Sequence, residues 1–310
     1  MILGVDTSNY TTSTALFDYN NDKIYNFKKM LPVKQGERGL RQSDAVYHHT
    51  ANLPQVVDEA FALCNKIEAV GVSVRPRDVE GSYMPCFKAG FNIANTVSKL
   101  LNVPMYEFSH QAGHIAAALF SAKRLDLIDK KFIAFHFSGG TSEALLVTPD
   151  DDRVFKCELI SASSDLKAGQ VIDRCGVMLD MSFPCGAELE KLSELSDKDY
   201  KIKASVKDGF VSLSGIENKF TKMLNDGEQA CDIAKFTIQS INSAVDAMTE
   251  CVLNKCGNLP LVYAGGVMSN KYIKNHLVSK FNGFFAEPEF STDNSAGIAV
   301  LTAYKGGFIK

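Results

Sequence analysis

Residues 131–150 read KFIAFHFSGGTSEALLVTPD and join two apolar runs through a short turn that contains two glycines. Residues 1–19, MILGVDTSNYTTSTALFDY, repeat this arrangement at the start of the chain. A third run follows in each place, DKIYNFKKM at 22–30 and RVFKCELIS at 153–161. Runs of this kind, separated by tight polar turns, predict three consecutive strands. A unit of three strands is therefore expected twice.

Alternating helical and strand patterns follow each of these units. Helices are expected near residues 47–64, 86–101, from 111, 167–179, 229–255, 269–280 and 296–304, and strands at 69–74, 104–108 and 259–266. This doubled pattern predicts an α/β protein with mixed sheets flanked by helices, in two lobes. We place the lobes at residues 1–125 and 126–310, with a polar insertion around 182–227.

Composition narrows the class of protein. The 310 residues are 45% hydrophobic and carry a formal net charge of −3, so a strongly basic nucleic-acid binder is not indicated. No run of 18 apolar residues suggests a membrane span, and the first residues do not resemble a signal peptide. Eight cysteines without a CxxC pair are typical of reduced thiols in a cytoplasmic protein, and make a metal site built from cysteines alone improbable.

Two histidines lie four residues apart in FSHQAGHIAAAL, residues 108–119. On a helix, His110 and His114 share one face, so their rings can grip one metal ion or can simply be two helix histidines. In STDNSAGIAV, residues 291–300, Asp293 reads either as part of a helix cap or as a third ligand. Two imidazoles and a carboxylate suit iron(II) or zinc.

Three polar turns follow predicted strands, at Ser138–Thr141, Ala264–Val267 and Asp6–Ser8. Glycines in such turns let backbone N–H groups converge on a phosphate, although a hairpin turn that needs positive φ gives the same pattern. The second turn leads into a predicted helix, which suits a nucleotide and makes Gly265 and Gly266 candidate binding residues. Asp173, read as standing at a helix beginning, can hold a ribose hydroxyl or can be an ordinary solvated residue.

Taken in order, several stretches resemble the TsaD family of tRNA threonylcarbamoyl transferases, once called O-sialoglycoprotein endopeptidases. They are ILGVDTS, GHIAAAL, FSGGTSEALLV, GQVIDRCGVMLDMSFPCGAELEKL, SLSGIENKF, YAGGVMSN and FSTDNSAGIA. The resemblance implies the two-lobed actin-like ATPase fold (ASKHA: actin, sugar kinase, heat-shock ATPase). It also implies transfer of an L-threonylcarbamoyl group from threonylcarbamoyl-AMP to the adenosine next to the anticodon of tRNA.

The same resemblance implies roles for individual residues and partners. The residues that fall on family positions are His110, His114 and Asp293 for one Fe²⁺ or Zn²⁺ ion, Phe137, Ser138, Gly139, Gly140 and Thr141 for the substrate phosphate, and Asp173, Gly186 and Asn270 for the adenylate. No catalytic residue beyond the metal ligands is expected. The cofactor expectation is an adenine nucleotide, with ATP or ADP left open. The partner expectation is tRNA, TsaB-like and TsaE-like proteins, and a homodimer or heterodimer through the helices of the first lobe.

Departures from the family leave the acceptor open. Gln111 stands where a zinc peptidase of the HExxH type has its glutamate base, so we reject a protease. The acids expected after the first turn are replaced in Asn9-Tyr10-Thr11, and Arg75 and Arg77 appear in VRPRDVEGSYMP. The chain therefore reads as a divergent paralogue. Two alternatives stay open, a carbamoyltransferase with another acceptor and a non-catalytic nucleotide-binding subunit.

Overall fold

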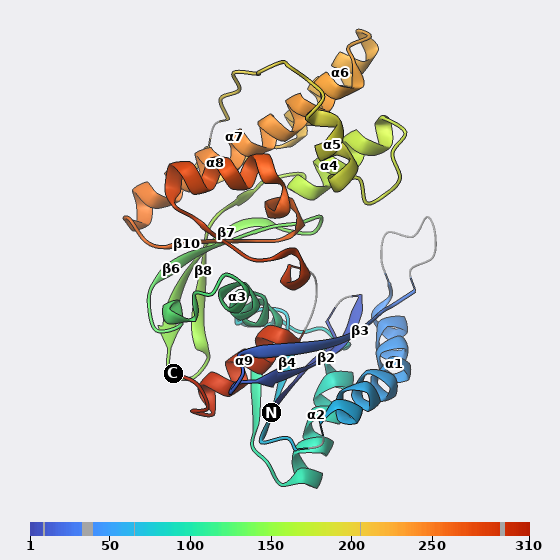
Figure 1. The fold of residues 1–310 in the computed structure, drawn as a ribbon, viewed down its shortest axis with the longest axis vertical. Coiled ribbons are helices and arrows are strands. Elements are labelled where there is room, and N and C mark those ends of the chain that lie inside the picture. Colours follow the sequence, from blue (N-terminus) through green and yellow to red (C-terminus); the bar gives the residue numbers. More distant parts are fainter. Residues whose placement is uncertain (9, 33–39, 65, 205, 292–294) are drawn as a thin grey trace. The chain divides into compact units, whose positions relative to one another are not determined.

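The computed structural model describes residues 1–8, 10–32, 40–64, 66–204, 206–291 and 295–310. These residues form two compact units (Figure 1). Unit 1 comprises Met1–Ile128, Pro149–Lys156 and Glu289–Lys310, and unit 2 comprises Asp129–Thr148 and Cys157–Pro288. The sequence suggests one boundary near residue 125, between two halves with similar strand patterns. The two compact units are instead each assembled from separate segments of the chain, so the boundary between the halves stays a prediction. Among the described residues, every helix is too short or too polar to span a bilayer.

Unit 1 is built on a five-stranded mixed sheet with the order β3-β2-β1-β4-β5. Its strands are β1 (Ile2–Asp6), β2 (Thr11–Asp18), β3 (Lys23–Met30), β4 (Ala69–Arg75) and β5 (Met105–Ser109). Its helices are α1 (Gln42–Leu63), α2 (Phe87–Leu101), α3 (His110–Ser121), the 3₁₀ turns η1 (Leu125–Leu127) and η3 (Pro288–Phe290), and α9 (Ala296–Lys305). Strands β1, β4 and β5 are parallel, so their carboxyl ends share one edge of the sheet.

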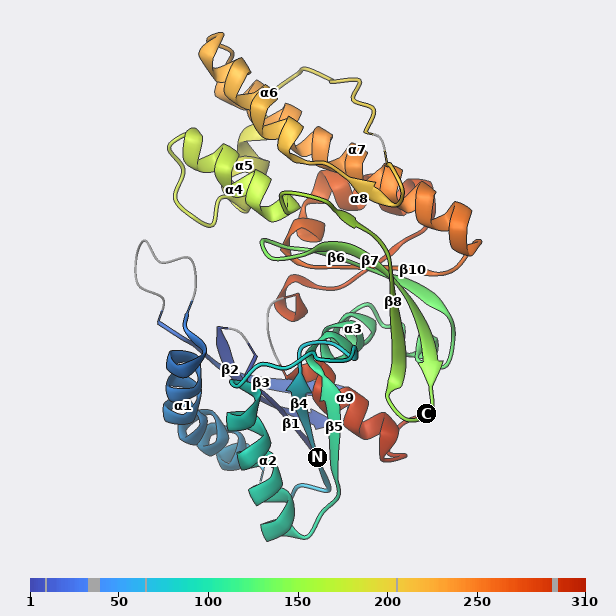
Figure 2. The same cartoon turned by 180° about the vertical axis from the view of Figure 1, so that it is seen from behind.

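Side chains in β1 alternate between the two faces of this sheet. Leu3 and Val5 join the core that packs beneath α1 and α2, which lie side by side in both views (Figures 1 and 2). Gly4 faces the other way, where a Cβ would meet Ala299 of α9. Gly71, the partner of Gly4 in β4, likewise faces Ile298 and Thr302. The two glycines let α9 lie directly on the sheet.

Unit 2 repeats the strand plan. Its sheet has the order β11-β10-β6-β7-β8-β9, in which β8-β7-β6-β10-β11 corresponds to the five strands of unit 1. The strands are β6 (Phe132–Phe137), β7 (Ser142–Asp150), β8 (Val154–Ser163), β9 (Phe210–Val211), β10 (Leu261–Ala264) and β11 (Phe284–Phe285). The helices are α4 (Ala168–Met178), α5 (Gly186–Ser193), α6 (Ser214–Asn225), α7 (Ala230–Cys256), the 3₁₀ turn η2 (Gly266–Ser269) and α8 (Lys271–Phe281).

An aromatic row fixes the register of the central strands in unit 2. The rings of Phe135 and Tyr263 stack with centroids 4.7 Å apart, and Tyr263 stacks on Phe285 at 4.9 Å. The Tyr263 hydroxyl lies 3.0 Å from Thr249 Oγ1 in α7, which gives this buried polar group a partner. The prediction of two α/β lobes with mixed sheets is confirmed. The insertion at 182–227, expected only to be polar, contains α5 and α6.

Candidate functional site

The two sequence-predicted histidines meet at the start of α3. Ser109 caps this helix by accepting a hydrogen bond from Ala112 N–H at 3.2 Å, so His110 is the first helical residue and His114 follows one turn later. Their Nε2 atoms lie 2.9 Å apart. Bonds of about 2.0–2.1 Å from one metal ion, at ligand angles of about 90–110°, place two nitrogens about 2.9–3.4 Å apart. The pair therefore fits a single metal ion.

Asp6, at the end of β1, lies against the Nδ1 side of the His110 ring. Its Oδ2 lies 2.7 Å from Nδ1 of His110, and its Oδ1 accepts a hydrogen bond from Ser8 N–H at 2.7 Å. Burial works to raise the pKa of Asp6, but the charge of His110 and the hydrogen bonds from His110 and Ser8 hold that pKa below its usual value. The carboxylate is thus an acceptor for both neighbours.

The expected third ligand, Asp293, lies outside the described residues. In the part of the chain that the structure describes, no group of three His, Cys, Asp or Glu residues could hold a metal ion. The first turn of α9, which follows Asp293, packs on α3: a Cβ on Gly297 would collide with Gly113 O and Ala117 N. Two of the three expected ligands are therefore seen together, and the role of Asp293 stays a prediction.

The loop Ser138–Thr141 is a tight turn between β6 and β7. Ser138 N–H donates to Thr141 O at 2.8 Å, and Ser138 Oγ accepts from Gly140 N–H and Thr141 N–H. Neither Gly139 nor Gly140 has the left-handed φ that would require glycine, and a Cβ on either would meet no atom within 4 Å. A hairpin turn that needs positive φ does not explain these glycines. The space above them is open, as a phosphate loop requires.

Two further elements approach this loop within unit 2. The first turn of α4 docks on it, since Gly169 N–H donates to Ser138 O at 3.1 Å and a Cβ on Gly169 would lie 2.6 Å from Gly139 N. Gly265, after β10, has φ +98° and lies against Phe137 O. A helix N-terminus and a second glycine turn thus surround the loop, which favours an anion there. The Phe137 ring is buried in the core, so only its backbone is at the loop.

The three remaining adenylate candidates also belong to unit 2. Asp173 lies in the middle of α4, not at a helix beginning as the sequence was read. Its Oδ1 accepts from Cys185 N–H at 2.9 Å, and burial raises its pKa. Gly186 begins α5, where a Cβ would make only an ordinary contact with Ile172 at 3.9 Å, and Asn270 caps α8 by accepting from Ile273 N–H at 3.1 Å. Asp173 and Asn270 have structural roles, and the role of all three residues in binding adenylate stays a prediction.

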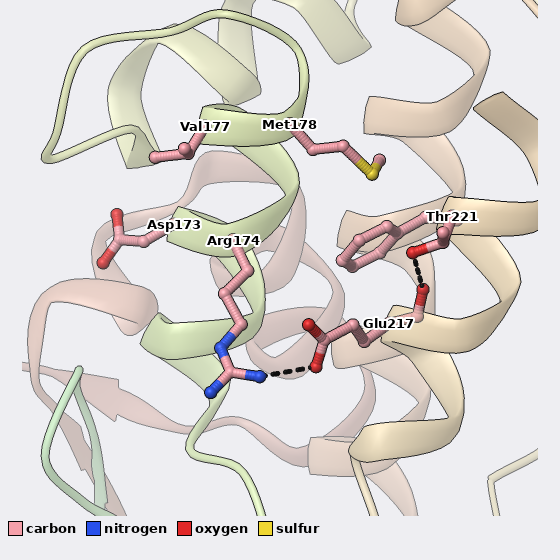
Figure 3. A pocket seen from close by; sticks show the side chains of 7 residues that line it. Asp173, Arg174, Val177, Met178, Glu217 and Thr221 are labelled. Atoms are coloured by element: carbon pink, nitrogen blue, oxygen red, sulfur yellow. Dashed lines mark hydrogen bonds and ion pairs between the residues drawn. The ribbon is translucent and has the colours of Figure 1, made fainter.

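A pocket of about 460 Å³ lies between α4 and α6 (Figure 3). It is lined by Asp173, Arg174, Val177, Met178, Glu217, Phe220 and Thr221. Arg174 Nη1 and Glu217 Oε2 form an ion pair at 2.7 Å across it. Asp173 and Met178 project from different sides of α4 in this view. Asp173 is the only predicted nucleotide residue in its lining.

The third polar turn, Asp6–Ser8, is not an open phosphate loop. Its residues are at most 1% exposed, and Thr7 Oγ1 donates to Cys86 O and accepts from Gly90 N–H, both at 3.0 Å. Arg75, one of the two arginines that depart from the family pattern, pairs with Asp78 at 2.6 Å. The contact between Asp6 and His110 was missed by sequence reasoning. The available signal was that β1 ends, and α3 begins after β5, at the shared carboxyl edge of the parallel strands in a mixed sheet.

The open space above the phosphate loop leads to a direct prediction. We expect Gly140→Ala to weaken AMP binding by about tenfold or more, because the new methyl group occupies room that the phosphate needs, a loss of about 1.4 kcal/mol. Calorimetric titration with AMP measures this. Adenosine, which lacks the phosphate, should bind parent and variant equally, and the melting temperature should not change. Equal AMP affinity would mean that the loop does not hold phosphate.

Comparisons with known proteins show which family the chain resembles along its length. The family model "TsaD: tRNA N6-adenosine threonylcarbamoyltransferase" matches residues 28–300. A tRNA N6-adenosine threonylcarbamoyltransferase of Thermosipho melanesiensis is 27% identical over 97% of this chain and 93% of its own length. One from Campylobacter fetus is 27% identical over 96% of this chain and 90% of its own length.

Solved structures of low sequence identity share the fold. Full-length HypF in its phosphate- and nucleotide-bound form has a TM-score of 0.60 at 15% identity, covering 99% of this chain and 55% of its own. Component A of (R)-2-hydroxyglutaryl-CoA dehydratase from Acidaminococcus fermentans has a TM-score of 0.58 at 14% identity, covering 99% and 98%. The predicted actin-like fold class is thereby confirmed.

Proposed function

The chain belongs to the tRNA N6-adenosine threonylcarbamoyltransferase family, and on that premise we propose that it transfers an L-threonylcarbamoyl group from threonylcarbamoyl-AMP to tRNA. The acceptor is the exocyclic amine of the adenosine next to the anticodon. That nitrogen attacks the carbamoyl carbon, the bond from this carbon to the phosphate oxygen breaks, and AMP leaves while the amine loses a proton. The observation that carries the proposal is the pair of Nε2 atoms 2.9 Å apart in a member of this family.

Residues of unit 2 are assigned to the leaving group in this proposal. The Ser138–Thr141 turn and the first turn of α4 are assigned to the phosphate of AMP as it departs, because a helix N-terminus favours negative charge and the two glycines leave room above the turn. Gly140 N–H and Thr141 N–H donate to Ser138 Oγ here, so they would exchange that acceptor for the phosphate. Asp173 and Asn270 orient the nucleoside. Both are held by other contacts, so their side chains need little ordering when the ligand binds.

Residues of unit 1 are assigned to the metal. His110 and His114 hold one Fe²⁺ or Zn²⁺ ion, with Asp293 as the third ligand in this proposal. A metal ion bound there would supply Lewis-acid polarisation of the carbamoyl oxygen. Histidine and carboxylate ligands accept either metal, so its identity is left to measurement.

Purified protein incubated with threonylcarbamoyl-AMP and a tRNA that reads ANN codons tests the proposal, with and without TsaB-like and TsaE-like partners. Mass spectrometry of digested tRNA should detect threonylcarbamoyladenosine, and a chelator should abolish it. Absence of product in every partner combination, with metal shown to be bound, would contradict the proposal. Transfer to another acceptor would instead identify a related carbamoyltransferase, and nucleotide binding without transfer would identify a non-catalytic subunit.

A further inference from the structure

Asp6 uses its two carboxylate oxygens on two different partners inside unit 1. Oδ1 accepts from Ser8 N–H and Oδ2 lies against Nδ1 of His110, both at 2.7 Å, in a site where Asp6 is 1% exposed. We propose that Asp6 is a positioning residue that keeps the proton of His110 on Nδ1, so that the Nε2 lone pair points at the metal. This inference rests on the metal site of the proposed function.

The protons that Asp6 and His110 can donate determine the tautomer of His110. An ionised carboxylate only accepts hydrogen bonds, so His110 must present Nδ1–H to Asp6. A neutral imidazole carries one N–H, so Nε2 of His110 is then unprotonated, which is the form that binds a metal. That same Nε2 lies 2.9 Å from Nε2 of His114. A carboxylate behind a metal-binding histidine fixes both the tautomer and the direction of the ring.

The fold explains why residues 104 positions apart can meet in this way. Asp6 ends β1, and His110 follows directly on β5. Strands β1, β4 and β5 are parallel neighbours, so both residues emerge at the same edge of one sheet. Ser109 fixes the first turn of α3 through its own cap and donates to Asp78 Oδ2 at 2.6 Å. The cap of α3 therefore fixes the backbone of His110, and Asp6 fixes the Nδ1 side of its ring.

Asp6→Asn tests the inference because Ser8 dictates how the amide must turn. Ser8 N–H needs an acceptor, so the amide oxygen takes the Oδ1 position and the NH₂ group faces Nδ1 of His110. Nδ1 must then accept, which moves the ring proton to Nε2. We expect the affinity for Zn²⁺ or Fe²⁺, measured by chelator competition, to fall by about 10–100-fold. Imidazole ¹⁵N shifts in the metal-free protein should show His110 change from the Nδ1–H to the Nε2–H form.

Asp232→Asn is the matched control, since it makes the same change at a buried carboxylate in unit 2. Asp232 accepts from Ser196 Oγ and pairs with Lys198, and neither partner belongs to the proposed metal site. Metal affinity and the His110 tautomer should equal those of the parent. Asp6→Asn protein that binds metal within twofold of the parent, with Nδ1–H retained, would overturn the inference.

Two measurements on the parent protein test the inference even if the variant does not fold or the parent does not bind metal. If Asp6→Asn does not fold, the ¹⁵N spectrum of the parent decides: an Nε2–H form of His110 in the metal-free parent overturns the inference, and an Nδ1–H form supports it. If the parent binds neither Zn²⁺ nor Fe²⁺, the metal part of the proposed function fails. The tautomer comparison between parent and variant then tests the control of His110 by Asp6 separately.

Discussion

His114→Ala protein should bind Fe²⁺ or Zn²⁺ at least about 100-fold more weakly than the parent and should lose threonylcarbamoyl transfer. In the proposed site His114 supplies one of three protein ligands, so its removal would take away a metal–nitrogen bond, and a 100-fold loss corresponds to about 2.8 kcal/mol. The variant should keep its melting temperature. His114 is partly exposed in α3, and alanine is the better helix former. Chelator competition and the transfer assay measure the two losses.

His276→Ala is the control for that variant. His276 lies in α8 of unit 2 with Nε2 3.1 Å from Asp246 Oδ2, so it is a histidine in a hydrogen bond but outside the metal site. It should bind metal as the parent does. Equal affinity of the His114→Ala and parent proteins would mean that the two α3 histidines are an ordinary helix pair, which is the alternative that the sequence left open.

Local sequence patterns predicted most of the helices and strands. The strands β1–β3 and β6–β8 were expected because short apolar runs alternate with tight polar turns, and a hairpin depends only on neighbours in sequence. The helices α1 to α4 and α7 to α9 follow from the same local reasoning. Helix α6 was missed because its segment was interpreted only as a polar insertion, although Ile216, Phe220 and Met223 have helical spacing and pack against the core.

Contacts between residues far apart in the chain could not be predicted from local sequence patterns. Asp6 was interpreted as part of a phosphate turn because the sequence alone did not show that its partner is His110. Gly139 and Gly140 were identified as a candidate loop, but only the structure shows that their backbone does not require glycine, which removes the competing explanation. A sequence pattern can indicate that a residue is a candidate for a site, whereas the side chain that it contacts depends on the tertiary fold.

Helices α3 and α9 of unit 1 approach each other so closely at Gly297 that a side chain does not fit between them. A Cβ on Gly297 would collide with Gly113 O and Ala117 N, which are backbone atoms and cannot rotate aside. We expect Gly297→Ala to lower the free energy of unfolding by about 3 kcal/mol, at the upper end of overpacking costs, because α9 must move away from α3. The melting temperature should fall by about 6–12 °C, as measured by calorimetry.

Gly215→Ala separates this steric effect from the ordinary effect of glycine in a helix. Gly215 lies in α6, and a Cβ there would meet no atom within 4 Å. Since alanine is the better helix former, this variant should be as stable as the parent or slightly more stable. If Gly297→Ala behaved in the same way, α9 would be able to shift on α3 at little cost. Gly297 would then be dispensable at this crossing, and the start of α9 would not be fixed beside α3.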